Sequence, residues 1–351
     1  MKAQVAVLGG DGIGPEVCDE AVRVLEAVAT RFGHAFEMRQ ALFGGCAIDV
    51  HGDGLPPDTL ALALRADAVL MGAIGGPKWG PSATVRPEQA LLRLRRELGV
   101  FANLRPIQVH PALRNSSVLR AEIIDGVDFI FVRELTGGIY FGRKSRDANS
   151  ATDECCYTVT EIERITRVAG QIAMRRKKRI TQIDKSNVLE TSRLWREVSE
   201  RIIRSEFSQV SIEHMLVDAA AMHLIRRPRD FDVLLTENMF GDILTDEAAM
   251  LSSSLGLLPS ASLGLGTHGL YEPIHGSAPD IAGQGIANPI GTILSAALLL
   301  RHSLQLEAEA QLIEAAVAAA ITGGARTADI AEPGSKPLNT RQMGDAVLAH
   351  L

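Results

Sequence analysis

The chain has few aromatic residues, few cysteines and no long apolar run. Aromatic residues make up 4% of its 351 residues, and it has four cysteines, Cys18, Cys46, Cys155 and Cys156. These cysteines lack the spacing of a metal site, and the two adjacent ones cannot form a relaxed disulfide with each other. We therefore expect no disulfide framework and a reducing compartment. The sequence assigns no role to Cys155 and Cys156.

The sequence also lacks a membrane segment, a secretory leader and an excess of positive charge. Nowhere do roughly 20 apolar residues run together, and the N-terminal MKAQVAVLGGDGIGPE passes from a short apolar run directly into glycines without a cleavage site. The net charge of −6 argues against a broad nucleic-acid surface. We expect a soluble, cytoplasmic protein with no membrane and no nucleic-acid partner.

What is present indicates an α/β fold. A chain of 351 residues suggests two domains or one large two-lobed unit. Apolar runs at 4–8 and 67–73 predict buried strands, whereas 15–28 and 87–98 have helical spacing. This alternation of strand and helix predicts a largely parallel sheet. The polar, irregular stretch 143–153 predicts an exposed loop or arm.

Two carboxylates lie four residues apart in FDVLLTENMFGDILTDEAAM, the stretch from Phe231 to Met250. A short strand is expected first and a helix second, so Asp242 and Asp246 share one helical face. The apolar side of that helix is expected to comprise Ile243, Leu244, Ala248 and Met250. The two carboxylates suit a hard cation such as Mg²⁺ or Mn²⁺. The alternative is ordinary negative charge near a helix N-terminus.

Three arginines fall on separate predicted elements. Arg95 lies on the helix 87–98, Arg105 follows in FANLRP, and Arg133 ends the strand FIFVREL. Because arginine binds carboxylates in a bidentate manner, the three could clamp a dicarboxylate if they converge. The alternative is that they are solvated on exposed faces.

Further polar side chains follow predicted strands. Lys185 follows the strand 180–183, and Asp218 ends the strand 210–217. Because the carboxyl ends of parallel strands meet at one sheet edge, these residues are expected at the same edge as Asp242 and Asp246.

Two glycine-rich segments lie next to helices. The segment 9–14, GGDGIG, joins a strand to a helix and is a candidate phosphate loop. It lacks the GxGxxG spacing, and no acidic residue ends a second strand, so a conventional Rossmann site is disfavoured. The second segment, 271–289, is rich in backbone donors and leads into a helix N-terminus.

Nine segments, in order along essentially the whole chain, resemble the metal-dependent decarboxylating dehydrogenases of the isocitrate/isopropylmalate dehydrogenase family. They are GGDGIGPEV, FGGCAID, GAIGGPKW, VFANLRP, RELTGGIYFG, DKSNVLETSRLWREV, ENMFGDILTDEAAM, SLGLLPSASLG and YEPIHGSAPDIAGQGIANP. The resemblance implies two lobes on a continuous mixed sheet: residues 1–100 with 253–351 in the cofactor-binding lobe, and 101–252 in a lobe that carries the metal and substrate site. The second lobe would also form a homodimer whose active sites are shared between subunits.

The resemblance also implies roles for the charged residues. Arg95, Arg105 and Arg133 would bind substrate carboxylates, and Asp242 and Asp246 would hold Mg²⁺ or Mn²⁺ with Asp218 of a second subunit, which also contacts the substrate. Lys185 of that subunit would accept the proton of the 2-hydroxyl, and Tyr140 would protonate the carbon that loses CO₂.

For the cofactor, the resemblance implies NAD bound by the loop that follows Tyr271. The corresponding residues are Glu272, His275, Gly276, Ser277, Ala278, Asp280, Ile281, Ala282 and Asn288. A carboxylate at Asp280 would accept hydrogen bonds from the ribose hydroxyls and repel a 2′-phosphate. The alternative is that Asp280 is a turn or helix-cap residue.

The alkyl side chain of the substrate would contact Glu88, Leu91 and Leu92. The apolar side chains of the two leucines favour a branched aliphatic group over a third carboxylate, and together with the resemblance this implies 3-isopropylmalate and leucine biosynthesis. The alternatives are that the leucines are ordinary core, that the substrate is tartrate or another 3-substituted malate, or that the chain is a non-catalytic regulatory paralogue. That paralogue would be expected to lack Lys185, Tyr140 or a metal aspartate, all of which are present.

Overall fold

The computed structural model describes residues 1–80, 82–117, 119–332 and 334–351. The chain forms two compact units, Met1–Val100 with Ser252–Leu351 and Phe101–Leu251. The sequence prediction had placed the corresponding boundaries at 100/101 and 252/253. None of the helices in the described ranges combines the length and the hydropathy that a membrane span requires.

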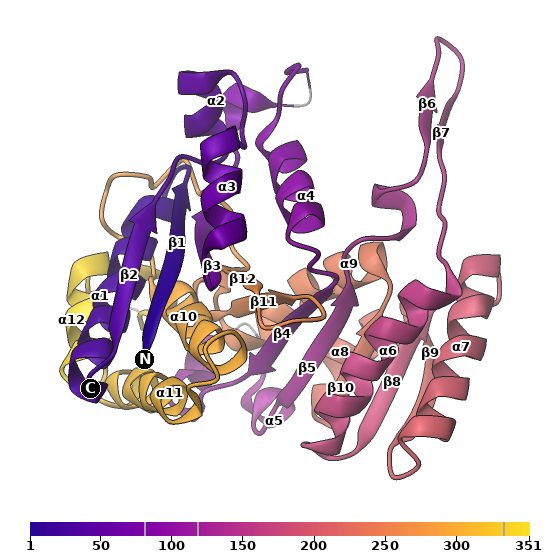
Figure 1. The fold of residues 1–351 in the computed structure, drawn as a ribbon. Helices are drawn as coiled ribbons and strands as arrows, with labels where there is room; N and C mark the ends of the chain where they lie inside the picture. Colours follow the sequence, from indigo (N-terminus) through magenta and orange to yellow (C-terminus); the bar gives the residue numbers. More distant parts are fainter. Residues whose placement is uncertain (81, 118, 333) are drawn as a thin grey trace. The chain divides into compact units, whose positions relative to one another are not determined.

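The first unit has a mixed sheet in the order β2-β1-β3-β12-β11 (Figure 1). Its strands are β1 (Lys2–Gly10), β2 (Ala35–Gln40), β3 (Ala68–Ala73), β11 (Pro259–Leu263) and β12 (Gly269–Pro273). The first three pair in parallel and β12 runs parallel to β3, whereas β11 and β12 form an antiparallel hairpin.

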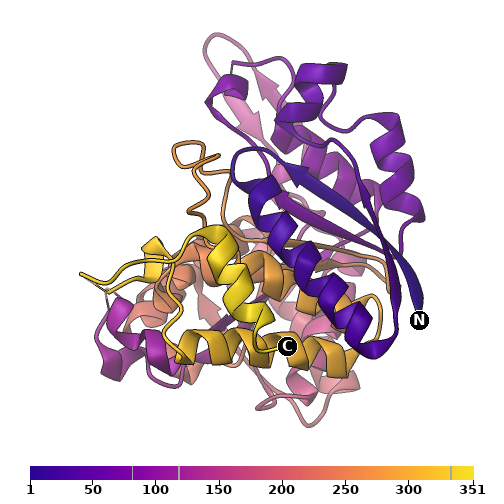
Figure 2. The same ribbon diagram turned by 90° about the vertical axis from the view of Figure 1, so that its left-hand side faces the viewer.

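Helices cover both faces of this sheet because the strands are apolar on both sides. They are α1 (Gly14–Phe32), α2 (Gly45–His51), α3 (Pro57–Arg65), α4 (Pro87–Glu97), α10 (Ile290–His302), α11 (Glu307–Thr322) and α12 (Thr340–Leu348). Alternate residues of β1 and β3 form one core with side chains of α3 and α4. The helices α1, α11 and α12 lie side by side (Figure 2), and α10 packs between them and β12.

The second unit has a mixed sheet in the order β4-β5-β10-β8-β9. Its strands are β4 (Ala102–Gln108), β5 (Asp128–Glu134), β8 (Arg179–Asp184), β9 (Ser211–Leu216) and β10 (Val233–Thr236). All neighbours are parallel except β4 and β5. Its helices are α5 (Ala121–Ile124), α6 (Val159–Met174), α7 (Glu190–Glu206), α8 (Val217–Arg226) and α9 (Asn238–Ala249). The helix α6 packs on α7 and α8 packs on α9, and both pairs contact the sheet.

The segment predicted as an irregular arm is an ordered β-hairpin. Strands β6 (Lys144–Arg146) and β7 (Ala151–Asp153) pair antiparallel and extend away from the rest of their unit (Figure 1). The carboxylate of Asp147 closes the turn by accepting hydrogen bonds from the backbone N–H groups of Asn149 and Ser150. Hydrophobic alternation could not reveal this hairpin, because all six strand residues are exposed.

The apolar side of α9 differs from the prediction. Leu244 and Ala248 are buried, but Ile243 is 60% exposed, and Met250 follows the helix and is also exposed. Residues 244 and 248 are one turn apart and share the buried face, whereas residue 243 points about 100° away.

Candidate active site

The two predicted carboxylates lie one turn apart on α9. Glu237 caps this helix by accepting a hydrogen bond from Phe240 N, which fixes where α9 begins after β10. The side chain of Asp242 is 38% exposed and that of Asp246 is 68% exposed. The helix therefore presents both carboxylates on one partly open face, with Asp246 the more accessible.

Two of the three predicted arginines converge on this carboxylate pair. Arg105 from β4 and Arg133 from β5 are both buried. Arg105 Nη1 lies 3.5 Å from Asp246 Oδ1, and its Nη2 lies 4.0 Å from Asp242 Oδ1. Arg133 Nη1 forms an ion pair with Asp242 Oδ1. The antiparallel pairing of β4 and β5 places the two guanidinium groups next to each other.

Tyr140 lies at the same point. Its hydroxyl donates a hydrogen bond of 2.9 Å to Asp242 Oδ2. Burial and the adjacent charge of Asp242 raise the pKa of Tyr140 to about 12, so the phenol holds its proton at neutral pH. The hydroxyl can therefore serve as a proton donor.

The two carboxylates have pKa values shifted in opposite directions. For Asp242, burial favours the neutral form, but the charge of Arg133, the hydrogen bond from Tyr140 and the charge of Arg105 outweigh it and lower the pKa. For Asp246, burial dominates and raises the pKa against the opposing charge of Arg105. Asp242 is thus the more readily ionised of the two.

Lys185 and Asp218 form a separate pair in this chain. Lys185 Nζ donates a hydrogen bond of 2.8 Å to Asp218 Oδ1, and this bond lowers the pKa of Asp218. Within the part of the chain that the structure describes, no three or more Asp, Glu, His or Cys side chains are grouped so as to hold a metal ion. Asp218 therefore does not join Asp242 and Asp246 within one chain, although all three follow parallel strands of one sheet.

The two α9 carboxylates meet part of the ligand requirement of a divalent cation. Both provide the hard oxygen ligands that Mg²⁺ and Mn²⁺ prefer, and Asp246 is accessible. The two oxygens of Asp242 are engaged by Arg133 and Tyr140, so a cation would compete with these groups. A complete ligand set would need an oxygen donor from outside this chain.

In the first unit, Arg95 lies on α4 and pairs with Glu272 at the end of β12. The distance from Arg95 Nη2 to Glu272 Oε1 is 2.8 Å, and both side chains are about nine-tenths buried. On α4, Glu88, Leu92 and Arg95 follow the i, i+4, i+7 spacing of one helical face. Leu91 packs against the first unit's core, as its alternative interpretation supposed.

The predicted cofactor loop divides into packed and open residues. Ala278, Ile281 and Ala282 pack against Ile13, Val17 and Ala287, and Ala278 has φ of +38°, a left-handed conformation that is strained in a residue with a side chain. Ser277 is buried, whereas Gly276 and Asp280 are exposed. No hydrogen bond or ion pair among the described residues involves the Asp280 carboxylate, which remains open to a ligand.

Two polar residues of this loop differ in what they can still bind. Asn288 is engaged at both ends of its amide, since Oδ1 accepts from Ile290 N and Nδ2 donates to Asp329. His275 Nδ1 contacts the Gly276 carbonyl at 2.9 Å, so this nitrogen carries the proton. His275 Nε2 is a buried acceptor without a partner among the described residues, and burial lowers the pKa of the ring. His275 Nε2, an acceptor without a partner in the described parts of the chain, and the open carboxylate of Asp280 belong to the same loop. Together they fit a nucleotide that offers amino and hydroxyl donors.

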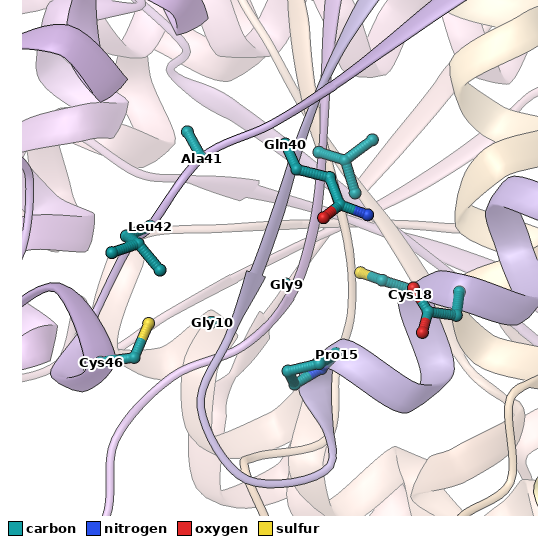
Figure 3. Close-up of a pocket in the computed structure, with 10 residues that line it drawn as sticks. Gly9, Gly10, Pro15, Cys18, Gln40, Ala41, Leu42 and Cys46 are labelled. Carbon is teal, nitrogen blue, oxygen red and sulfur yellow. The ribbon is translucent and has the colours of Figure 1, made fainter.

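The glycine-rich segment 9–14, a candidate phosphate loop, uses three of its N–H groups within the protein. Its N–H groups at Asp11, Ile13 and Gly14 bond to Ala73, Ser277 and Asp11 carbonyls. A Cβ at Gly12 would lie 1.9 Å from the Ser277 carbonyl oxygen, so the glycine permits close packing on the cofactor loop. A pocket of ≈ 280 Å³ lies beside this segment (Figure 3), and it is lined by residues that include Cys18, Gln40 and Cys46 but no predicted site residue.

Several polar residues that support the site were missed as site residues by sequence reasoning. Asp11 is buried and accepts hydrogen bonds from three backbone N–H groups, at Gly45, Cys46 and Gly75. Asn238 contacts Arg133, and Thr245 contacts Arg105. Asp11 follows β1, and Asn238 and Thr245 lie on α9, which follows β10. A polar residue soon after a strand is the sequence signal that could have identified them.

Comparison with known proteins gives a consistent result. A profile of the family described as isocitrate/isopropylmalate dehydrogenase matches residues 4–347. A 3-isopropylmalate dehydrogenase of Anaeromyxobacter dehalogenans is 59% identical over 100% of both chains. One from Halalkalibacterium halodurans is 55% identical over 99% of this chain and 97% of its own.

Solved structures agree with these matches. An isocitrate dehydrogenase from Methylococcus capsulatus superposes with a TM-score of 0.88 at 33% identity, over 99% of each chain. A β-decarboxylating dehydrogenase from Thermococcus kodakarensis gives a TM-score of 0.81 at 37% identity, over 99% of this chain and 96% of that one.

Proposed function

The chain belongs to the isocitrate/isopropylmalate dehydrogenase family, and from this premise we propose that it catalyses the NAD-dependent oxidative decarboxylation of (2R,3S)-3-isopropylmalate in leucine biosynthesis. The products are 4-methyl-2-oxopentanoate and CO₂. The relatives named 3-isopropylmalate dehydrogenase, which match the chain over its full length, support this substrate.

The observation that carries the proposal is the group around Asp242. Two buried arginines, an accessible carboxylate and a protonated tyrosine lie against one aspartate. Arginines bind substrate carboxylates, aspartates bind the cation, and a phenol can return a proton to carbon. These are the groups that oxidation and decarboxylation of a hydroxy diacid require.

The substrate's alkyl group is assigned to α4. Leu92 lies on the helical face that also carries Glu88 and Arg95. An apolar side chain beside an arginine suits a ligand with one carboxylate and one branched aliphatic substituent, whereas a third carboxylate would be left without a cation partner. This supports isopropylmalate over isocitrate, and an apolar leucine would leave the 3-hydroxyl of tartrate without a hydrogen-bond partner.

NAD is assigned to the loop after β12. The exposed, unengaged carboxylate of Asp280 can accept hydrogen bonds from ribose hydroxyls, and it would repel the phosphate of NADP. His275 Nε2 provides a neutral acceptor nearby in the sequence. Asn288, with both ends of its amide engaged, would act by holding the start of α10 in place.

A homodimer would complete the site. Lys185 and Asp218 pair with each other and do not join the α9 carboxylates of their own chain. Exposed apolar side chains on α8 and α9, Met222, Ile225 and Ile243, provide a surface for a second copy. We assign Lys185 and Asp218 of that copy to the active site formed around Asp242.

The chemistry then divides among the protein groups. Asp242 and Asp246, with Asp218 of the second subunit, would hold the cation; bound at these residues, the cation would supply polarisation of the 2-hydroxyl, and NAD bound at the loop after β12 would supply an acceptor for the hydride from C2. Lys185 of the second subunit takes the hydroxyl proton, and Arg105 and Arg133 hold the substrate carboxylates. The bond from C3 to its carboxylate breaks and CO₂ leaves, and the Tyr140 hydroxyl donates a proton to C3. The two arginines therefore hold substrate carboxylates, whereas Lys185 and Tyr140 each transfer one proton.

The direct test is steady-state NAD reduction by the purified protein with Mg²⁺ or Mn²⁺. The substrates compared are 3-isopropylmalate, isocitrate, tartrate and other 3-substituted malates. We expect the highest kcat/KM with 3-isopropylmalate and with NAD rather than NADP. A higher value with another malate would contradict the substrate assignment, and metal-independent turnover would contradict the role of Asp242 and Asp246.

A further inference from the structure

Asn238 is a buried polar residue to which the proposed reaction gives no role. It is the first residue of α9, and only 1% of its surface is exposed. Its side chain contacts Arg133 and the loop that carries Tyr140, and both Arg133 and Tyr140 contact Asp242. Its position between two proposed active groups makes it the strongest feature outside the assigned set.

The amide oxygen of Asn238 fixes one edge of the Arg133 guanidinium. It accepts hydrogen bonds from Nε at 3.1 Å and from Nη2 at 2.8 Å, while Nη1 pairs with Asp242. Because a guanidinium is planar, two bonds along one edge set the direction in which the remaining N–H groups point.

The amide nitrogen of Asn238 holds the loop that carries Tyr140. Nδ2 donates a hydrogen bond of 3.2 Å to the Gly137 carbonyl, and residues 138–140 form a short 3-10 helix immediately after it. The backbone N–H of Asn238 also donates to the Tyr157 hydroxyl at 2.9 Å, and a Cβ at Gly138 would lie 2.3 Å from that hydroxyl. One residue therefore supports the tyrosine loop directly and through Tyr157.

The stem of Arg133 is positioned by the same helix. A Cβ at Gly241 would lie 2.7 Å from Arg133 Cγ and 2.4 Å from Thr236 Oγ1. The arginine therefore crosses α9 where the helix has no side chain, and its head reaches Asn238. Both the path and the orientation of Arg133 are set by α9.

We propose that Asn238 is a positioning residue that orients Arg133 and the Tyr140 loop towards the same substrate. The inference rests on the proposed function, because that function assigns Arg133 to the substrate carboxylate and Tyr140 to proton transfer. Only an amide meets both requirements here. Arginine offers donors and needs an acceptor, whereas the Gly137 carbonyl needs a donor. A carboxylate at this position would lose the donor and add negative charge beside Arg133.

The kinetic test compares wild type with Asn238→Asp and Asn238→Leu. For Asn238→Asp we expect KM for 3-isopropylmalate to rise roughly 10- to 100-fold, because the new carboxylate keeps the contact with Arg133 but competes with the substrate carboxylate for its charge, an effect on the order of one charge-assisted contact. The kcat should also fall because the Gly137 carbonyl loses its donor, while KM for NAD is unchanged. Asn238→Leu removes both contacts of the side chain, so it should likewise raise KM for 3-isopropylmalate and lower kcat. Asn339→Asp is the matched control, since Asn339 caps α12 through an oxygen that aspartate retains.

Two further readouts separate positioning from general destabilisation. Calorimetric binding of 3-isopropylmalate with Mg²⁺ should weaken in Asn238→Asp by the same factor as KM, with no change in NAD binding. Crystal structures of wild type and Asn238→Leu should show the Arg133 guanidinium rotated and residues 137–140 displaced.

The outcomes distinguish this inference from the proposed function. If wild type neither binds nor oxidises 3-isopropylmalate, the proposed function fails, and the crystal structures alone decide the positioning role. If Arg133 and Tyr140 keep their places in Asn238→Leu, or if KM for substrate and for NAD change equally, the positioning role is overturned even in an active enzyme.

Discussion

At the scale of single residues, the site depends on how neighbouring charges set the protonation of three groups. Arg133 and Tyr140 keep Asp242 ionised, burial keeps a proton on Asp246 to higher pH, and the pKa of Tyr140 is raised to about 12. The sequence placed these residues on the correct elements, but their pKa shifts arise from contacts between β4, β5 and α9. The pKa shifts of Asp246 and Tyr140, and the open carboxylate of Asp280, each predict the effect of a substitution.

Asp246→Asn is expected to have opposite effects on stability and on metal binding. The pKa of Asp246 is raised in the folded state, so folding favours its protonated form, and its contribution to stability falls as pH rises from the unfolded pKa through the folded pKa. At neutral pH the neutral amide should therefore raise the thermal midpoint of the metal-free protein slightly. The same change should abolish stabilisation by Mg²⁺ or Mn²⁺.

The measurement is thermal unfolding with and without each cation as the pH is lowered from neutral into the acid range. In wild type, the stabilisation by the cation should decline towards the acidic end as Asp246 takes up a proton. Equal stabilisation by Mg²⁺ in wild type and variant would contradict the role of Asp246 as a ligand.

Tyr140→Phe is expected to lower kcat by about 10²- to 10⁴-fold, the usual contribution of a positioned acid, with a smaller change in the KM for substrate. Product analysis measures this together with the rate of CO₂ release. Tyr271→Phe is the matched control, because Tyr271 is a buried tyrosine of the first unit whose hydroxyl contacts Ser303. That variant should lose stability and keep its kcat. A Tyr140→Phe enzyme with normal kcat would exclude Tyr140 as the acid.

Asp280→Ala is expected to raise the KM for NAD and reduce the preference for NAD over NADP. The exposed carboxylate has no hydrogen-bond or ion-pair partner among the described residues, so its removal should leave the thermal midpoint unchanged. The measurement is kcat/KM for both cofactors. An unchanged NAD/NADP ratio would instead support the interpretation of Asp280 as a turn residue.

At the scale of elements, α4 separates two leucines that the sequence could not distinguish. Both leucines lie on the side of the helix that carries Glu88 and Arg95, but Leu91 packs against the core formed with β1, β3 and α3, whereas Leu92 is not one of the described residues of that core. Adjacent positions on a helix differ by 100°, so one residue can serve the core and the next can serve the substrate.

Leu91→Ala and Leu92→Ala are therefore expected to have different effects. Leu91→Ala should lower the free energy of unfolding by roughly 2 kcal/mol, with little change in substrate preference. Leu92→Ala should reduce the preference for 3-isopropylmalate over malate by about 10-fold or more, since such pockets discriminate by about 1–3 kcal/mol for each methylene. Unfolding by denaturant and kcat/KM with both substrates measure these effects. The reverse pattern would show that Leu92 is the core residue.

The other elements differ in how well the sequence revealed them. Strands β1, β3, β5, β8, β9 and β10 and helices α1, α4 and α10 followed from apolar periodicity, whereas β2, β4, β11 and β12 were not predicted. The hairpin β6–β7 was not predicted either, because its strands are polar on both faces and its turn depends on the Asp147 side chain. The exposure of Ile243 on α9 was also missed, since periodicity identifies apolar residues but not whether a neighbour covers them.

At the scale of the whole molecule, the proposed homodimer assigns the Lys185–Asp218 pair of one subunit to the site around Asp242 of the other. If each site draws Lys185 from one subunit and Asp242 from the other, Lys185→Met and Asp242→Asn proteins should each be inactive. Mixed under conditions that exchange subunits, they should regain activity, because the heterodimer has one site with both residues intact. Absence of recovery in a mixture shown to contain heterodimers would contradict a shared site.

The sequence by itself determined the fold class, the positions of several strands and helices, and the residue types of the candidate site. These follow from hydrophobic periodicity, from polar residues at strand ends, and from nine segments shared with the family. Only the tertiary structure decided that Arg105, Arg133 and Tyr140 meet at Asp242, that Arg95 pairs with Glu272, and that Asn238 holds two of these groups. The reason is physical. Such contacts join residues up to 177 positions apart in the sequence. Local patterning specifies each element, but it does not specify the distances between side chains on different elements.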